Sequence, residues 1–183
     1  MEHFSTQRLI ARDWTTADAE SAFAIYGREE VARWLGAEPR RPAASVEAMR
    51  ARLEHIIALN AQHSQPYGLW ALELRGSGAL VGAVLLLPLP GGGGEVEVGW
   101  HLNPDHWGQG YATEAGRGAL GLAFGVCGLA EVLAVVYPDN ARSIAVCRRL
   151  GMTHLGRTDR YFGATLELFR IRDKARKPGG EAN

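Results

Sequence analysis

This 183-residue chain has no excess of charge of either sign, only two cysteines and no long apolar run. Twenty basic residues oppose twenty acidic ones, so the net charge indicates neither nucleic acid nor a membrane surface as a partner. Cys127 and Cys147 fit no disulfide framework and no metal-ligand spacing, and they favour a reducing compartment. Even the apolar stretch from Ala79 to Leu89 is too short to cross a bilayer. We therefore expect a cytoplasmic protein without a metal.

The remaining composition is that of a globular protein. Hydrophobic residues make up 46% of the chain and charged residues 22%, which is enough for one good core. The N-terminus is polar and does not resemble a signal peptide. We expect a single domain over residues 1–173, followed by a polar, frayed tail over residues 174–183 that contains Pro178-Gly179-Gly180.

The first half of the sequence predicts a strand, then three helices, and then a hairpin followed by a further strand. Ser45 is a helix N-cap before apolar residues at helical spacing, and Gly76-Ser77-Gly78 is typical of a hairpin turn. The expected strands are Arg8–Asp13, Tyr67–Leu74, Leu80–Leu87 and Glu95–Leu102. The expected helices begin after the cap at Thr15, at Glu29 (running to Leu35) and after Ser45, with a loop over Gly36–Pro42.

The second half predicts a helix from about Tyr111 to Val126, a strand Val132–Tyr137 and a helix from about Ala141 to Leu150. Strands His154–Tyr161 and Thr165–Arg172 then close the domain. Hairpins followed by a strand–helix–strand unit predict an α/β fold, with a mixed sheet of about seven strands and helices on both faces.

The segment from Glu97 to Ala115 is the most informative part of the chain. It combines a strand that carries a carboxylate, a Gly108-x-Gly110 bend and the start of a helix. Free backbone N–H groups at such a helix start can bind an anion beside the carboxylate. A P-loop would need Gly-Lys-Ser/Thr, and a dinucleotide fingerprint would need Gly or Ala at Thr113. Neither pattern is present.

A second segment, Tyr137 to Met152, places Asn140 between a strand and a helix, with Ser143 one helical turn later. Taken alone, Asn140 would be a helix cap and Ser143 a surface residue. Together with the Gly-x-Gly bend, however, the two residues indicate a ligand site at an opening in the sheet.

These segments resemble the GNAT superfamily of acyl-CoA-dependent N-acyltransferases, and most closely the ribosomal-protein alanine N-acetyltransferase branch. The run Trp107-Gly-Gln-Gly-Tyr-Ala-Thr-Glu-Ala115 is similar to the phosphate-binding motif of that branch. Its Asn-x-x-Ser helix is matched from Asn140 to Met152, and the likeness covers nearly all of residues 5–173. The resemblance implies a splayed, mostly antiparallel sheet in which the fourth and fifth strands diverge to admit pantetheine.

The resemblance also implies which residues bind acetyl-CoA. The backbone of the strand before the bend would pair with pantetheine, the bend would bind the pyrophosphate, and the second segment would contact the pantetheine arm and the adenosine phosphate. Asp105 departs from the family pattern, in which many members have Gln or Arg. The implied set is Trp100, His101, Leu102, Gly108, Gln109, Gly110, Tyr111, Ala112, Thr113, Asn140, Arg142 and Ser143, with Arg148 as a further candidate.

The expected reaction is direct attack of a primary amine on acetyl-CoA in a ternary complex. A protonated amine cannot attack a thioester, so a base is required. Glu97 occupies the position at which the family often carries that base, and strand alternation places it on the same face as His101. Cys147 stands where many members have a Tyr as general acid. The related branch implies Ser143 as its substitute.

The acceptor stays open at this point. Trp34, Tyr67, Trp70, Tyr161 and Phe162 are candidates to line its pocket, although aromatic residues are more often core. Many relatives carry an Asp near Tyr161–Thr165, and this chain does not. A peptide α-amine, an amino-acid amine or an amine antibiotic are all compatible with the sequence. The alternative to an enzyme is a catalytically silent acyl-CoA sensor, which Cys147 favours. The branch resemblance makes a homodimer possible.

Overall fold

The computed structural model describes residues 1–36, 39–63 and 66–175. Its eight strands form one sheet in the order β1-β2-β3-β4-β5-β6-β8-β7. The strands are β1 Glu2–Ser5, β2 Leu9–Arg12, β3 Gly68–Leu74, β4 Leu80–Pro88, β5 Val96–Leu102, β6 Glu131–Val136, β7 Thr153–Thr158 and β8 Leu166–Arg172. All neighbouring strands are antiparallel except β5 and β6, which are parallel. The predicted mixed sheet is confirmed, with one strand more than expected.

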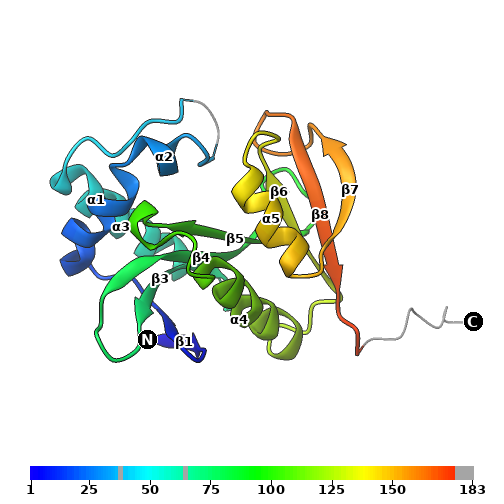
Figure 1. Ribbon diagram of the computed structural model, residues 1–183, viewed down its shortest axis with the longest axis horizontal. Coiled ribbons are helices and arrows are strands. Elements are labelled where there is room, and N and C mark those ends of the chain that lie inside the picture. The colour runs from blue at the N-terminus through cyan, green and yellow to red at the C-terminus, as the bar shows by residue number, and fades with distance from the viewer. Residues whose placement is uncertain (37–38, 64–65, 176–183) are drawn as a thin grey trace, which may run out of the picture.

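Helices cover both faces of this sheet (Figure 1). The helices are α1 Ala19–Tyr26, α2 Glu29–Ala32, α3 Val46–Asn60, α4 Tyr111–Gly125 and α5 Ala141–Arg149. Two 3₁₀ turns, η1 and η2, cover Thr16–Asp18 and Pro104–His106. Among the residues that the structure describes, none of the helices is both long and apolar enough to cross a membrane.

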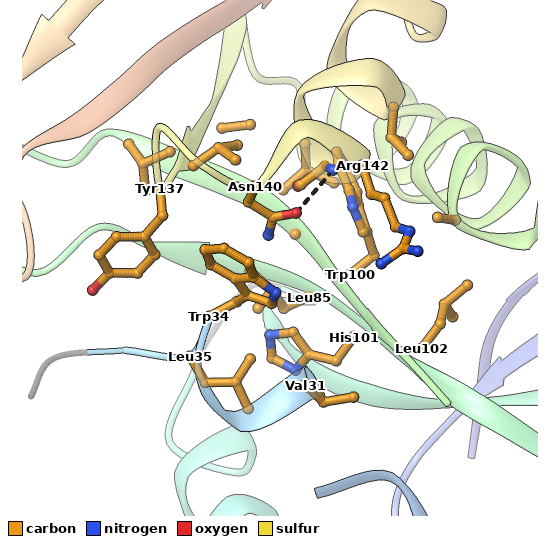
Figure 2. Close-up of a pocket in the computed structure, with 18 of the residues that line it drawn as sticks. Val31, Trp34, Leu35, Leu85, Trp100, His101, Leu102, Tyr137, Asn140 and Arg142 are labelled. Atoms are coloured by element: carbon orange, nitrogen blue, oxygen red, sulfur yellow. Dashed lines mark hydrogen bonds between the residues drawn. The ribbon is translucent and has the colours of Figure 1, made fainter. Parts of the chain in front are cut away.

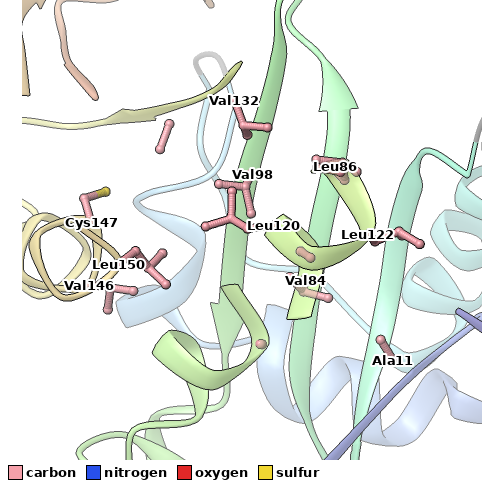
Figure 3. Close-up of a cluster of buried hydrophobic side chains, with 14 of the residues drawn as sticks. Ala11, Val84, Leu86, Val98, Leu120, Leu122, Val132, Val146, Cys147 and Leu150 are labelled. Carbon is pink, nitrogen blue, oxygen red and sulfur yellow. The ribbon is translucent and has the colours of Figure 1, made fainter. Parts of the chain in front are cut away.

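The larger core lies between the sheet and α4 and α5. Val84, Leu86 and Val98 project from the central strands against Leu120 and Leu122 of α4, as Figure 3 shows. Helices α4 and α5 approach closely, because a Cβ at Gly116 would lie 2.8 Å from a methyl group of Leu150. A second core packs α1 and α3 on the opposite face, and a third covers the far side of β6 and β8.

The structure differs from the predicted elements in three places. Strand β1 was not predicted, and α2 ends at Ala32 rather than Leu35. Strand β7 ends at Thr158 rather than Tyr161, after a bulge near Gly156, whose φ is +97°. Ala37 and Glu38 of the predicted loop and residues 176–183 of the predicted tail lie outside the described residues.

Candidate active site

Strands β5 and β6 pair at a single point and then diverge. Glu97 is in register with Leu133, and this is the one bridge found between the two strands within the described chain. A cleft of about 1170 Å³ opens beyond it. Its wall is built from the ends of β5 and β6, the segment after α2, the turn before α4 and the first turns of α4 and α5 (Figure 2).

The register of β5 on β4 determines which backbone groups face this opening. The Asn103 amide donates to the Val81 carbonyl at 2.9 Å. Because hydrogen-bonded pairs alternate in an antiparallel ladder, the backbone groups of Val98, Trp100 and Leu102 point away from β4, toward the opening. Those of His101 point toward β4. The register therefore favours Trp100 and Leu102 among the predicted backbone partners, and His101 reaches the cleft through its side chain.

The turn after β5 is held by Trp107. Its indole N–H donates to the carbonyl of Leu102 at 3.0 Å. The Arg142 guanidinium lies over the Trp107 ring, with its central carbon 4.5 Å from the ring centre. The Leu102 carbonyl is thus already satisfied, which leaves its N–H for a ligand.

The bend that follows has the conformation that its glycines predict. Gly108 and Gly110 have φ angles of +79° and +83°, a region that side chains rarely adopt. Gly110 is the N-cap of α4, so the first amides of that helix have no intrahelical acceptor. The Thr113 hydroxyl is buried and without a hydrogen-bond partner within the described structure. Unpaired donors at a helix N-terminus fit a phosphate group.

An ion pair anchors this bend from behind. Glu114, in the first turn of α4, accepts hydrogen bonds from the Thr6 hydroxyl and from the Arg8 backbone and guanidinium. The same guanidinium donates to the Gln109 carbonyl at 3.0 Å. Of the predicted residues in the bend, Gln109 is the one that does not line the cleft. The others, Gly108, Gly110, Tyr111, Ala112 and Thr113, do line it.

The start of α5 forms the opposite wall. The Asn140 side-chain oxygen caps the helix by accepting from the Ser143 amide at 3.2 Å, and its amide nitrogen lies on the cleft side (Figure 2). Asn140, Arg142 and Ser143 all line the cleft. So does Arg149, whereas Arg148 does not. Arg149 thus lies where Arg148 was expected.

Cys147 lies behind this wall. It is fully buried in the larger core and does not line the cleft. Burial also raises the pKa of its thiol to about 12. A buried thiol of that pKa is unsuited to protonate a ligand in the cleft.

Glu97 lies at the floor of the cleft, where β5 and β6 meet. Its side chain is partly accessible from the cleft but deep within the protein, and this burial raises the pKa of its carboxyl to about 8. No hydrogen bond or ion pair involves its carboxyl within the described structure. A carboxyl group of that pKa exchanges its proton near neutral pH, as a general base must.

His101 lies on the same face of β5, farther out. Its Nδ1 is 3.1 Å from the hydroxyl of Tyr26, a fully buried residue of α1. Burial, together with the charge of Arg52, lowers the pKa of His101 to about 4. The imidazole is therefore neutral at physiological pH. The Arg52 guanidinium itself lies 4.8 Å from the centre of the Tyr26 ring.

The segment after α2 covers one end of the cleft. Trp34 reaches across to Tyr137 at the end of β6, with ring centres 6.4 Å apart, and the Tyr137 hydroxyl donates to the Gly36 carbonyl at 2.7 Å. Phe162, at an unusual φ of 56°, completes this end. Trp34 and Phe162 thus line the cleft as predicted.

Three other aromatic residues do not line it. Trp70 and Tyr161 are fully buried in separate cores, and Tyr67 packs at the margin of the larger one. Sequence reasoning also missed Tyr26, Arg52 and Arg149. Tyr26 and Arg52 lie far from β5 along the chain, so no local motif could indicate that they meet it. To choose Arg149 over Arg148, one would need to know which face of α5 turns toward the cleft, and the sequence does not fix that to within one residue.

Comparisons with known proteins identify the family to which this fold belongs. The family model of the acetyltransferase (GNAT) domain matches residues 8–153. The chain is 30% identical over 152 residues to the N-acetyltransferase YoaA of Bacillus subtilis, a match that covers 82% of each chain. The ribosomal-protein-S5-alanine acetyltransferase of Vibrio fischeri has a similar structure, with a TM-score of 0.73 and 19% identity, covering 97% of this chain and 100% of that one. RimJ of Mycobacterium smegmatis, solved in complex with CoA-disulfide, also has a similar structure, with a TM-score of 0.74 and 19% identity. The match covers 91% of this chain and 83% of that one.

The chain therefore belongs to the GNAT family of acetyltransferases, and it is an acyltransferase. This family uses acetyl-CoA as the donor of the acyl group.

Proposed function

We propose that this protein transfers the acetyl group of acetyl-CoA to a primary amine by direct attack in a ternary complex. The acceptor is a protein N-terminal α-amine or a small-molecule amine. The observation that carries the proposal is that Glu97, with its raised pKa, opens into the same cleft as the N-terminus of α4 and the unpartnered Thr113 hydroxyl. The free thiols of Cys127 and Cys147 fit a reducing compartment, so we place the reaction in the cytoplasm.

The two walls of the cleft would bind different parts of the coenzyme. The backbone of Trp100 would pair with the pantetheine amides, as an added strand would. The amides from Gly108 to Thr113 would bind the diphosphate, assisted by the unpartnered Thr113 hydroxyl. Asn140 would donate its amide N–H to the pantetheine arm, and Arg142 and Arg149 would meet the adenosine phosphate.

Glu97 would prepare the acceptor for attack. An alkyl ammonium has a pKa of about 10.4, so most of the amine is unreactive at pH 7. The Glu97 carboxylate takes that proton, directly or through water. The free amine then forms the C–N bond to the thioester carbonyl carbon, and the C–S bond breaks. The nitrogen, now cationic, loses its second proton, which passes through water to the leaving thiolate. General-base assistance of this kind contributes about 10²–10⁴-fold.

The leaving thiolate would then take up a proton at the α5 wall. Cys147 is too deeply buried to supply it. The Ser143 hydroxyl lines the cleft and accepts no hydrogen bond in the described structure, so it is free to position the sulfur or a water beside it. A thiol pKa of about 8.5 makes the thiolate a good leaving group that needs little acid assistance.

The test separates turnover from coenzyme binding. Glu97→Gln should lower kcat by about 10²–10⁴-fold, and Ser143→Ala should lower it less, while acetyl-CoA affinity stays within about twofold of wild type. Glu95→Gln is the matched control, because Glu95 lies two residues away and pairs with Arg160 outside the cleft. Near-normal turnover in both cleft variants would contradict the assigned roles. Tight coenzyme binding without thiol release for any amine or peptide would contradict acetyl transfer itself.

A further inference from the structure

The acceptor end of the cleft contains a cation without a counter-charge. Arg52 projects from α3, is partly buried and lines the cleft. In the described structure its guanidinium contacts the Tyr26 ring and takes part in neither an ion pair nor a hydrogen bond. The arginines near the sheet edge differ, since Arg8 pairs with Glu114, and Arg12 with Asp18 and Glu73.

The surroundings of Arg52 leave its charge uncompensated. His101 is neutral, because burial and Arg52 itself lower its pKa to about 4. Tyr26 also stays neutral, because burial raises the pKa of its phenol. Glu30, the acidic residue of α2 that lines the cleft, is already paired with Arg28 at 3.3 Å. The five N–H donors of the Arg52 guanidinium therefore have no anionic partner among the described residues at the wall of the cleft.

Neighbouring groups at this end restrict what else can bind there. Val31, Leu35 and Leu85 form an apolar wall around His101, as Figure 2 shows. In the tautomer with Tyr26 donating to Nδ1, the ring proton of His101 is on Nε2 and available to a ligand. Arg52 and His101 together then offer N–H donors and no negatively charged acceptor.

Resting on the proposed acetyl transfer, we propose that the acceptor is an amine that also carries a carboxylate, and that Arg52 binds this carboxylate while the amine faces Glu97. Glu97 and His101 lie four residues apart on one face of β5, so their Cα atoms are about 13 Å apart. In an α-amino acid only one carbon separates the amine from the carboxyl group, so an amino acid held at Arg52 would give its proton to Glu97 through a chain of water molecules. The substrate class is thus a free amino acid or a related zwitterion. A polyamine would instead place a second cation against Arg52.

The test compares amines with and without a carboxylate, and it reads the effect of Arg52 from the change in preference between wild type and variant, because the different amine pKa values within a pair are common to both proteins. The panel is a set of free amino acids, each paired with its carboxamide, assayed by thiol release. Wild type should favour the carboxylate of the best pair by about 10- to 100-fold in kcat/KM, the range expected for a charged hydrogen-bonded pair. Arg52→Gln should reduce this preference to about twofold, mainly through KM, and Arg52→Lys should retain part of it. Arg50→Gln is the matched control on the same helix, since Arg50 donates to the Thr16 carbonyl on the surface.

A binding measurement separates this inference from acetyl transfer. N-acetylated amino acids and their carboxamides are titrated into the CoA-loaded protein, which requires no turnover. Carboxylate preference that disappears in Arg52→Gln supports the inference even if no amine is acetylated, in which case acetyl transfer alone fails. Equal binding of both forms, unchanged preference in Arg52→Gln, or equal turnover of peptides that lack a carboxylate near the amine would overturn the inference while acetyl transfer stands.

Discussion

Glu97 and His101 share one face of β5, and burial keeps both of them neutral by opposite shifts. Removal from water disfavours the charged form of each group, so the pKa of the carboxyl rises to about 8 and that of the imidazole falls to about 4. Consequently Glu97 is the group on this face that changes its proton occupancy near physiological pH. His101 acts as a fixed, neutral partner of Tyr26.

The first residue-scale prediction concerns the pH dependence of turnover. The base must be deprotonated to act, so kcat of the wild type should rise with pH and level off above about 8, the pKa of Glu97. Glu97→Gln should lose this step. Because titration of the amine is common to both proteins, the ratio of their profiles isolates Glu97. A ratio that does not change between pH 6 and pH 9 would contradict the assignment.

A second prediction at this scale concerns the buried Thr113 hydroxyl, which has no partner in the described structure. Thr113→Val keeps the shape but removes a polar group whose unsatisfied burial costs about 1–3 kcal/mol. We expect the free protein to gain about 1 kcal/mol in free energy of unfolding, and its affinity for CoA to fall about fivefold or more. Denaturant unfolding and CoA titration measure the two effects. Unchanged CoA affinity would show that this hydroxyl does not face the ligand.

At the scale of elements, α4 is arranged so that its N-terminus stays open toward the cleft. Gly110 caps the helix in a left-handed conformation, and Arg8 and Glu114 hold the bend from the side away from the ligand. The cap at α5 works differently, because the Asn140 oxygen satisfies the helix while its nitrogen remains available. Each helix start is thus stabilised by groups that leave its cleft side open.

Substitution of two glycines in this part of the chain tests the first arrangement. Gly110→Ala should lower the free energy of unfolding by about 1–2 kcal/mol, because φ is +83° there, and should weaken CoA binding. Gly121→Ala is the control, since Gly121 lies within α4 with open space around its position. Alanine there should instead stabilise the protein by about 0.5–1 kcal/mol and leave CoA binding unchanged. Equal effects of the two changes on CoA binding would contradict the role of the bend.

Most element positions follow from local patterns, and the differences have local causes. Strand β1 has four residues, and its Phe4 ring packs over Gly118 of α4, a contact between distant parts of the chain. Helix α2 is shorter than predicted, and the residues after it turn so that Trp34 reaches Tyr137. Strand β7 ends early, and Tyr161 is buried in the loop that follows. In each case tertiary packing overrides a local tendency.

At the scale of the whole molecule, one sheet is divided at the β5–β6 junction. Two parts of the sheet lie on either side of this junction and meet at the Glu97–Leu133 bridge (Figure 1). The aromatic rings of Trp34 and Tyr137 make a second contact across the cleft (Figure 2). A ligand lying between β5 and β6 would supply the pairing that the strands lack. Binding should therefore stabilise the whole fold as well as the site.

This arrangement predicts how acetyl-CoA changes stability. A ligand that binds only the folded state adds about 2.7 kcal/mol at 100 times its Kd, so the melting temperature should rise with coenzyme concentration. Backbone amides of β5 and β6 beyond the Glu97–Leu133 bridge should exchange hydrogen more slowly in the complex. Thermal unfolding and hydrogen exchange provide the measurements. Protection confined to β1–β3 or β7 would contradict coenzyme binding in the cleft.

Local patterns in the sequence determined the parts of this protein that depend on neighbouring residues. The Gly108-x-Gly110 bend, the Asn140 cap and the alternation along β5 each follow from backbone preferences that operate within a few residues. The tertiary structure decided what depends on burial and on distant contacts. Only the folded chain removes Glu97 from water and raises its pKa, buries Cys147 on the core side of α5, and brings Arg52 from α3 beside Tyr26 and His101. Ionisation and charge pairing depend on every group that surrounds a side chain, and those groups come from segments that are far apart along the chain.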